Sequence, residues 1–166
     1  MRACASSARK KEKRNNSPSK GIGILIVFTI LSLDQLSKFI VSKYLSAGQS
    51  VPIVKNILHL TLVHNTGAAF GIFKNQTFVF IIISLIALPA IYFNFKAKAA
   101  GQGQDKLTRL ALLLVISGAI GNLIDRIAWG YVIDFIDLRI WPVFNAADSA
   151  ITIGAVLLGY SLLKRK

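Results

Sequence analysis

The sequence predicts an all-α membrane protein with four transmembrane helices and a small β-element on the extracytoplasmic face. Hydrophobic residues make up 54% of the 166 residues and charged residues only 16%, whereas a soluble globular chain averages about 25% charged residues. Four apolar segments are spaced along the chain, and most of its 20 lysines and arginines lie outside them. A chain of this length is expected to form one domain.

The N-terminal region differs from the rest of the chain. Residues 1–20 are polar and basic, so they are expected to form a disordered cytoplasmic tail before a single membrane domain at 21–166. A cleaved signal peptide is the alternative, because the apolar run Ile22–Leu33 follows the basic residues. The helical pattern continues beyond this run and no small-residue cleavage motif follows, which favours the tail.

The apolar segments are expected to be helices at Gly21 to about Leu45, Asn75–Phe95, Leu110–Ile124 and Ser149–Leu163. A helix that spans roughly 30 Å of hydrocarbon needs about 20 residues. The second segment is long enough by itself, and membrane helices tolerate a proline such as Pro89. The third and fourth reach this length only if Asn122, Asp125 and Asp148 lie at or near the membrane boundary.

Lysines and arginines predict the orientation of these helices. They are concentrated before the first apolar segment, between the second and third, and after the fourth. Four spans place these regions on one side, which is the cytoplasm by the positive-inside rule. The net charge of +13 is therefore interpreted as a topology signal rather than as the basic patch of a nucleic-acid-binding protein.

The two outer connections have β-type patterns. Residues 58–64, LHLTLVH, alternate leucines with polar residues, which favours a strand over a helix. Residues 131–141, YVIDFIDLRIW, are rich in β-branched and aromatic residues and end at Pro142. These two pieces predict the β-element on the outer face.

Polar residues from distant segments converge at the same predicted depth. Five of the seven acidic residues map to the outer side: Asp34, Asp125, Asp134, Asp137 and Asp148. Each ionisable group in or near hydrocarbon costs roughly 2.5–3.5 kcal/mol on insertion scales. Their clustering therefore predicts a shared polar site.

Structural roles are open alternatives for several of these residues. Asp34 could neutralise Lys38 four residues later, Asp125 could pair with the adjacent Arg126, and Asp137 could pair with Arg139. Asn145 could cap the fourth helix, since asparagine is a preferred N-cap, and Asp148 in its first turn gains from the helix dipole. Asp134 has no basic residue within three positions, so a structural explanation is weakest there.

Two carboxylates that face each other can hydrolyse an amide. Like charges a few ångströms apart do not both ionise easily, so one carboxyl keeps a proton. The charged member can take a proton from water, while the protonated member polarises the carbonyl.

The single Cys4 and the isolated His59 and His64 predict neither an intramolecular disulfide nor a zinc site.

Five motifs resemble those of the bacterial lipoprotein signal peptidases (signal peptidase II), four-span aspartic peptidases of the inner membrane. In the family's order they are DQLSK (34–38), HNTGAAFG (64–71), GAIGNLIDR (118–126), GYVIDFID (130–137) and FNAADSAITIG (144–154). Together they cover most of residues 30–155, and the basic tail lies outside the match.

The resemblance implies that Asp134 and Asp148 are the catalytic aspartates. Residues implied to bind the substrate or support the pair are Asp34, Lys38, Asn65, Gly67, Asn122, Asp125, Arg126 and Asn145. Asp125 is the main rival for a catalytic role.

The resemblance also implies the substrate and the setting. The enzyme would cleave diacylglyceryl-modified prolipoproteins before the lipidated cysteine, as a monomer among membrane lipids, with no metal, organic cofactor or nucleic acid. Both termini would be cytoplasmic, with the site near the extracytoplasmic face. A small proton- or cation-coupled transporter is the alternative, since intramembrane acids are common on ion pathways; it predicts acids spread through the membrane depth and often an internal repeat.

Overall fold

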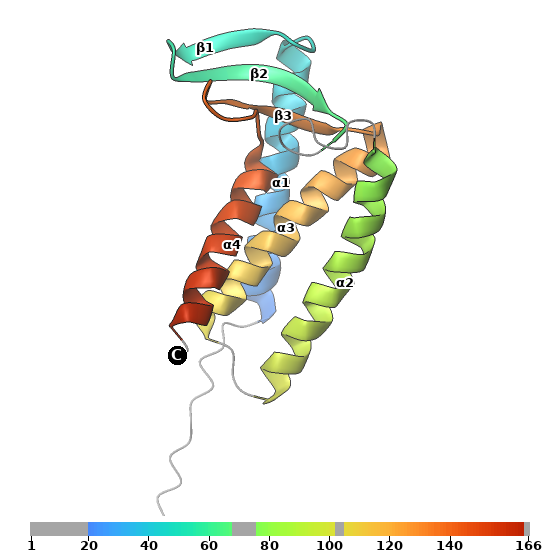
Figure 1. Cartoon of the computed structure of the whole chain (residues 1–166), viewed down its shortest axis with the longest axis vertical. Helices are drawn as coiled ribbons and strands as arrows, with labels where there is room; N and C mark the ends of the chain where they lie inside the picture. The colour runs from blue at the N-terminus through green and yellow to red at the C-terminus, as the bar shows by residue number, and fades with distance from the viewer. Residues whose placement is uncertain (1–19, 68–75, 102–104, 165–166) are drawn as a thin grey trace, which may run out of the picture.

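The computed structural model describes residues 20–67, 76–101 and 105–164. It contains four helices: α1 Lys20–Tyr44, α2 Thr77–Gly101, α3 Lys106–Trp129 and α4 Ala146–Leu163. They run side by side, with a small sheet at one end of the bundle (Figure 1). The predicted tail falls outside the described residues except for Lys20, which begins α1.

The four predicted helices exist, but α2, α3 and α4 are each longer than the predicted apolar segment. The third predicted segment, Leu110–Ile124, lies inside the 24-residue helix α3, and α4 begins three residues before Ser149. Both helices therefore include the polar residues at their sheet end, as a membrane span of sufficient length requires. Asp105 caps α3 by accepting a hydrogen bond from the backbone nitrogen of Thr108.

Among the described residues, three helices are long and apolar enough to cross a membrane: α1 from Gly21, α3 and α4. The apolar part of α2 whose side chains are described, Thr77–Phe93, is shorter. Length and composition therefore support three spans, and the fourth predicted span is not established by them. Helix α2 begins at Thr77, two residues after the predicted start of its apolar segment at Asn75.

The predicted β-element is a three-stranded antiparallel sheet. It has the order β1-β2-β3, formed by β1 Ser50–Val54, β2 Leu58–Asn65 and β3 Val132–Asp137. The sequence pattern located the second and third strands but did not single out the first. Apolar residues of β2 and β3 pack against Val41 near the end of α1, which fixes the sheet to the bundle.

Helix α3 approaches α4 and α1 through small residues. A Cβ atom on Gly154 would lie 2.6 Å from the backbone oxygen of Ala111, and one on Gly121 would lie 2.6 Å from Oδ2 of Asp34. Small residues at such positions let membrane helices pack backbone against backbone. This close packing brings the polar residues of α1, α3 and α4 within hydrogen-bonding reach.

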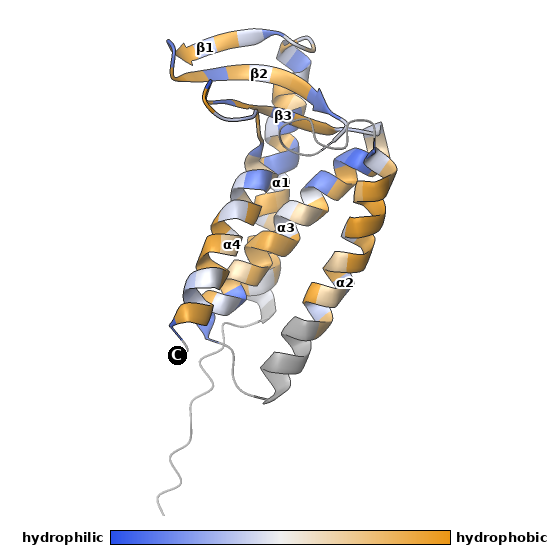
Figure 2. Ribbon diagram, viewed as in Figure 1, coloured by the Kyte–Doolittle hydropathy of each residue, from blue (hydrophilic) through white to orange (hydrophobic). Residues whose placement is uncertain are grey.

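Helix α2 has a different place in the bundle. In the described part of the chain it packs against α3 and against no other helix. Its first residue ties it to the sheet end, because Oγ1 of Thr77 donates to the backbone oxygen of Gly130 at 2.7 Å. Figure 2 shows hydrophobic residues over most of the helices and hydrophilic residues gathered where the helices meet the sheet.

Candidate active site

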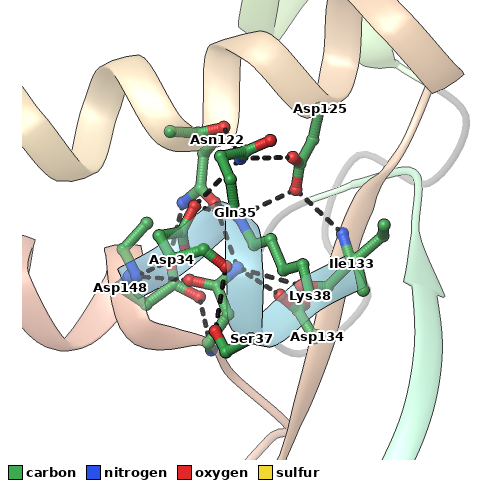
Figure 3. Close-up of polar contacts among 12 residues, drawn as sticks. Asp34, Gln35, Ser37, Lys38, Asn122, Asp125, Ile133, Asp134 and Asp148 are labelled. Carbon is green, nitrogen blue, oxygen red and sulfur yellow. Dashed lines mark hydrogen bonds and ion pairs between the residues drawn. The ribbon is translucent and has the colours of Figure 1, made fainter. Parts of the chain in front are cut away.

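The buried ammonium of Lys38 is the centre of an ion cluster. Its Nζ lies 2.7 Å from Oδ2 of Asp34 and 2.8 Å from Oδ2 of Asp125. It also donates to Oδ1 of Asn122 at 3.2 Å. All three hydrogen-bond donors of the lysine are therefore used. Figure 3 shows these side chains converging from α1 and α3.

The two carboxylates around Lys38 have further partners. Gln35 donates to Oδ1 of Asp125 at 3.0 Å, and the backbone nitrogen of Ile133 donates to Oδ2 at 3.2 Å. Oδ1 of Asp34 accepts from the backbone nitrogen of Ala147 at 2.9 Å, so this carboxylate satisfies one of the free amides in the first turn of α4. The cluster thus joins α1, α3, α4 and β3.

These contacts decide two alternatives. Asp34 does pair with Lys38, as the four-residue spacing suggested. Asp125 pairs with Lys38 and not with the adjacent Arg126, so the proposed pair at 125–126 is wrong. Neighbouring residues of a helix point about 100° apart, which sends Asp125 into the bundle while Arg126 lies beside the cavity described below.

Asn122 and Asn145 link the ion cluster to a second pair of carboxylates. Nδ2 of Asn122 donates to Oδ1 of Asp148 at 2.7 Å. Nδ2 of Asn145 donates to Oδ1 of Asp134 at 2.7 Å and to Oδ1 of Asn122 at 3.0 Å. The two amides therefore hold Asp134 and Asp148 in one network.

Asn145 caps α4, as its residue type predicts. Its side chain accepts from the backbone nitrogen of Asp148 at 2.8 Å, and Asp148 accepts in return from the backbone nitrogen of Asn145 at 3.3 Å. This reciprocal arrangement is a capping box. Asp148 is consequently fixed by the first turn of its own helix.

Asp134 lies on β3 with 2% of its surface exposed. Oδ2 accepts a hydrogen bond from Nδ2 of Asn65 at 2.9 Å, across the pairing of β2 with β3. Burial, followed by the nearby charge of Asp148, raises the pKa of Asp134 to about 7, against hydrogen bonds from Asn65 and Asn145 that act to lower it. This carboxyl therefore keeps its proton to a higher pH than an exposed aspartate does.

A cavity of about 390 Å³ opens beside this pair. Its polar lining includes Asn65, Asn122, Arg126, Asp134 and Asp148. Arg126 is half-buried, its guanidinium lies 5.1 Å from the centre of the Phe80 ring of α2, and its Nη1 donates to the backbone oxygen of Asn122. Gly67 also lines the cavity, where its backbone nitrogen donates to Oδ1 of Asn65 at 3.0 Å.

The structure brings all ten predicted site residues into this region but separates them into two groups. Asp34, Lys38 and Asp125 belong to the buried ion cluster, away from the cavity lining. The other seven line the cavity or, for Asn145, hold residues that do. Asp125, the rival of the predicted pair, has both oxygens occupied and is 1% exposed.

Asp137 has the structural partner suggested by its position. Its Oδ2 accepts from Oγ1 of Thr61 at 2.7 Å and pairs with Arg139 at 3.1 Å. Burial acts to raise the pKa of Asp137, but the hydrogen bonds from Thr61 and Arg139 outweigh it and lower the pKa below its ordinary value. A carboxylate held in its charged form outside the cavity fits a structural role.

One contributor was not predicted from the sequence. Gln35 donates to both carboxylates of the ion cluster and to the backbone oxygen of Gly121. It lies between Asp34 and Lys38 in the sequence, inside the DQLSK motif. That position is the signal that could have identified it.

The exposed His64 stacks on Tyr131 with ring centres 4.1 Å apart, as expected of a surface histidine.

The fold and the site define a membrane protein with a pair of carboxylates in a cavity at one end of its helical bundle. The family model described as signal peptidase (SPase) II matches residues 26–164. The lipoprotein signal peptidase of Halothermothrix orenii is 43% identical over 135 residues, which cover 81% of this chain and 90% of that protein. The one of Moorella thermoacetica is 43% identical over 140 residues, covering 84% and 91%.

Solved structures agree with these sequence matches. One bacterial membrane enzyme superimposes with a TM-score of 0.80 at 36% identity, covering 88% of this chain and 90% of the other. A second gives 0.78 at 35% identity, covering 89% and 96%. The chain belongs to the signal peptidase II family, and is thus a protease of the signal peptidase class.

Proposed function

We propose that this chain is an intramembrane aspartic endopeptidase that removes the signal peptide from diacylglyceryl-modified prolipoproteins, cleaving before the lipidated cysteine. The observation that carries the proposal is the arrangement of Asp134 and Asp148, which line one cavity and share Asn145 as a hydrogen-bond partner. Membership of the signal peptidase II family supports the removal of signal peptides from prolipoproteins.

In the proposed reaction the two carboxyls have different roles. Asp134 holds a proton below a pH of about 7 and donates it to the carbonyl oxygen of the scissile bond. Asp148 accepts hydrogen bonds from Asn122 and from the backbone of Asn145, as a carboxylate does, and takes a proton from a water molecule. The resulting oxygen attacks the carbonyl carbon. The tetrahedral intermediate collapses when the proton on Asp148 passes to the leaving amine, and Asp134 recovers its proton from the hydroxyl group of the carboxyl that is released.

The supporting residues hold this pair in place. Asn122 and Asn145 orient the carboxylates of Asp148 and Asp134. Lys38, between Asp34 and Asp125, holds α1 and α3 together beside this pair. Arg126 and the loop residues Asn65 and Gly67 are at the cavity wall, where they would contact the substrate backbone. No step in this scheme requires a metal or an organic cofactor.

We further propose that α2 is a fourth span and that the sheet lies on the extracytoplasmic side of the bacterial inner membrane. The basic residues near the end of α2 (Lys96 and Lys98), near the start of α3 (Lys106 and Arg109) and at both ends of the chain then share the cytoplasmic side. A lipid-anchored substrate could keep its acyl chains in hydrocarbon while the scissile bond meets the carboxylates at the outer end. The protein would act as a monomer.

The transporter alternative has no specific support in the described residues. Five acidic side chains lie at the sheet end, and Asp105 caps the opposite end of α3. An ion pathway would need such groups through the membrane depth. Ion flux in proteoliposomes that depends on Asp134 would support transport and count against the peptidase.

The test is cleavage of a diacylglyceryl-modified prolipoprotein by purified protein. Asp134→Asn and Asp148→Asn are expected to abolish cleavage, because each removes one proton-transfer group. Asp137→Asn is the matched control on the same strand as Asp134 and is expected to retain it. Activity in folded Asp134→Asn protein would refute the pair, and failure of the wild type to cleave would refute the proposed function.

A further inference from the structure

The cavity extends deeper into the helical bundle than the carboxylate pair. Its inner lining includes Ser84 of α2, Ala119 of α3, and Ile151 and Thr152 of α4. With a helical rise of 1.5 Å per residue, Ala119 lies roughly 4.5 Å deeper than Asn122, and Ile151 lies roughly 4.5 Å deeper than Asp148. This inner part, the cavity floor, is thus about one helical turn below the carboxylates.

The packing of α3 and α4 makes one side of this floor rigid. A Cβ atom on Gly118 would lie 2.8 Å from Cγ1 of Ile151 and still closer to the backbone oxygen of Ala147. Gly118 therefore faces α4, and Ile151 is already in tight contact there. Ala119 is rotated by about 100° from Gly118, so its methyl group lines the cavity beside α2, where Ser84 is also small.

The direction in which the substrate enters the cavity determines which of its residues reaches the cavity floor. This step rests on the proposed function. A signal peptide with its basic N-terminus in the cytoplasm enters the cavity from the inner side, so the residues before the scissile bond lie deeper than the bond itself. An extended chain advances about 3.3 Å per residue. A floor one helical turn below the carboxylates is therefore one to two residues before the cleaved bond.

We infer that Ala119 sets the size of the substrate side chain accepted immediately before the cleaved bond. The methyl group of Ala119 leaves room for a side chain between α2 and α4. A larger residue at position 119 removes that room, and Ile151 cannot retreat because it is packed against Gly118. Ala119 is a specificity-determining residue in this arrangement and takes no part in proton transfer.

The experiment compares substrates that differ only in the residue before the lipidated cysteine, which is glycine, alanine, valine or leucine. The quantity measured is kcat/KM for each peptide with the wild type, Ala119→Val and Ala119→Gly. One methylene in an apolar pocket changes selectivity by about 10–200-fold. Ala119→Val is expected to lower the kcat/KM of the alanine substrate relative to that of the glycine substrate by about tenfold. Ala119→Gly is expected to raise the kcat/KM of the valine substrate relative to that of the alanine substrate.

Matched substitutions at Ala128 are the control. This residue is exposed on the same helix and outside the cavity lining, so Ala128→Val and Ala128→Gly are expected to leave all ratios unchanged. Ratios that stay at the wild-type values in both Ala119 variants would overturn the inference while the proposed function stands. A wild type that cleaves none of the peptides would instead overturn the proposed function.

Discussion

Replacing Lys38 by methionine should destabilise the helical bundle severely. The ammonium lies 2.7 Å from Asp34 and 2.8 Å from Asp125, and Lys38 is only 2% exposed. Methionine keeps the length of the side chain but leaves two buried carboxylates without a counterion. Removing one partner of a buried ion pair costs about 3–5 kcal/mol. For a chain of this size each kcal/mol lowers Tm by roughly 2–4 °C, so a decrease of roughly 6–20 °C is expected.

The assay is thermal unfolding in detergent, followed by tryptophan fluorescence. Lys43→Met is the matched control, because Lys43 is an exposed lysine on the same helix, and its effect should stay within about 0.5 kcal/mol. Adding Asp125→Asn to Lys38→Met removes one of the unpaired charges and should recover part of the loss. The reasoning is refuted if Lys38→Met melts together with Lys43→Met, or if Asp125→Asn adds a further independent loss.

Other predictions concern pH, helix packing and the tail. Since Asp134 donates a proton and its pKa is about 7, kcat/KM should fall as pH rises through about 7. Asn65→Ala removes a hydrogen bond that lowers this pKa, so kcat/KM of the variant should fall at a higher pH than that of the wild type. An unmoved profile would contradict the assignment of Asp134 as the proton donor. Gly154→Ala forces a Cβ atom against the backbone of α3 and should cost about 1–3 kcal/mol in thermal unfolding. Gly159→Ala meets no atom within 4 Å and should unfold at or above the wild-type temperature. Deletion of residues 2–18 should leave cleavage intact, and inactive but correctly inserted, abundant protein would contradict this.

The helices could be predicted because they coincide with apolar segments, whereas their ends could not. Composition stops the third segment at Ile124, but α3 continues to Trp129. The polar residues there remain helical because Asp125 finds partners on α1 and β3. The helix ends where Gly130, in the left-handed conformation with a φ of 80°, donates its backbone N–H to the oxygen of Arg126, a glycine cap that the composition of the apolar segment does not reveal.

The first strand escaped prediction for a local reason. β1 has only five residues, contains Pro52 and is exposed throughout. Proline supplies no hydrogen-bond donor and usually marks an edge strand or a turn. Its strand conformation depends on pairing with β2, which in turn pairs with β3 across a long stretch of sequence.

The candidate site was predictable as a set of residues but not as a set of contacts. Clustering of acids at one depth pointed to a shared site, and motif resemblance selected Asp134 and Asp148. Adjacent charges, however, suggested a pair at Asp125 and Arg126, whereas the side chains that contact Asp125, those of Gln35 and Lys38, are on α1. Gln35, which donates to Asp125, is 90 positions away in the sequence, a separation at which spacing gives no information.

The span of the hydrogen-bond network has a consequence for the order of synthesis. Asp34 and Lys38 form a pair within one helix, so the first helix reaches the membrane with its lysine already neutralised. Ala147, whose amide binds Asp34, follows it by 113 residues, and Asp148 comes one residue later. Under the proposed mechanism a nascent chain is therefore inert until its last helix begins to form, and a fragment truncated before α4 would insert into the membrane without acquiring the ability to cut.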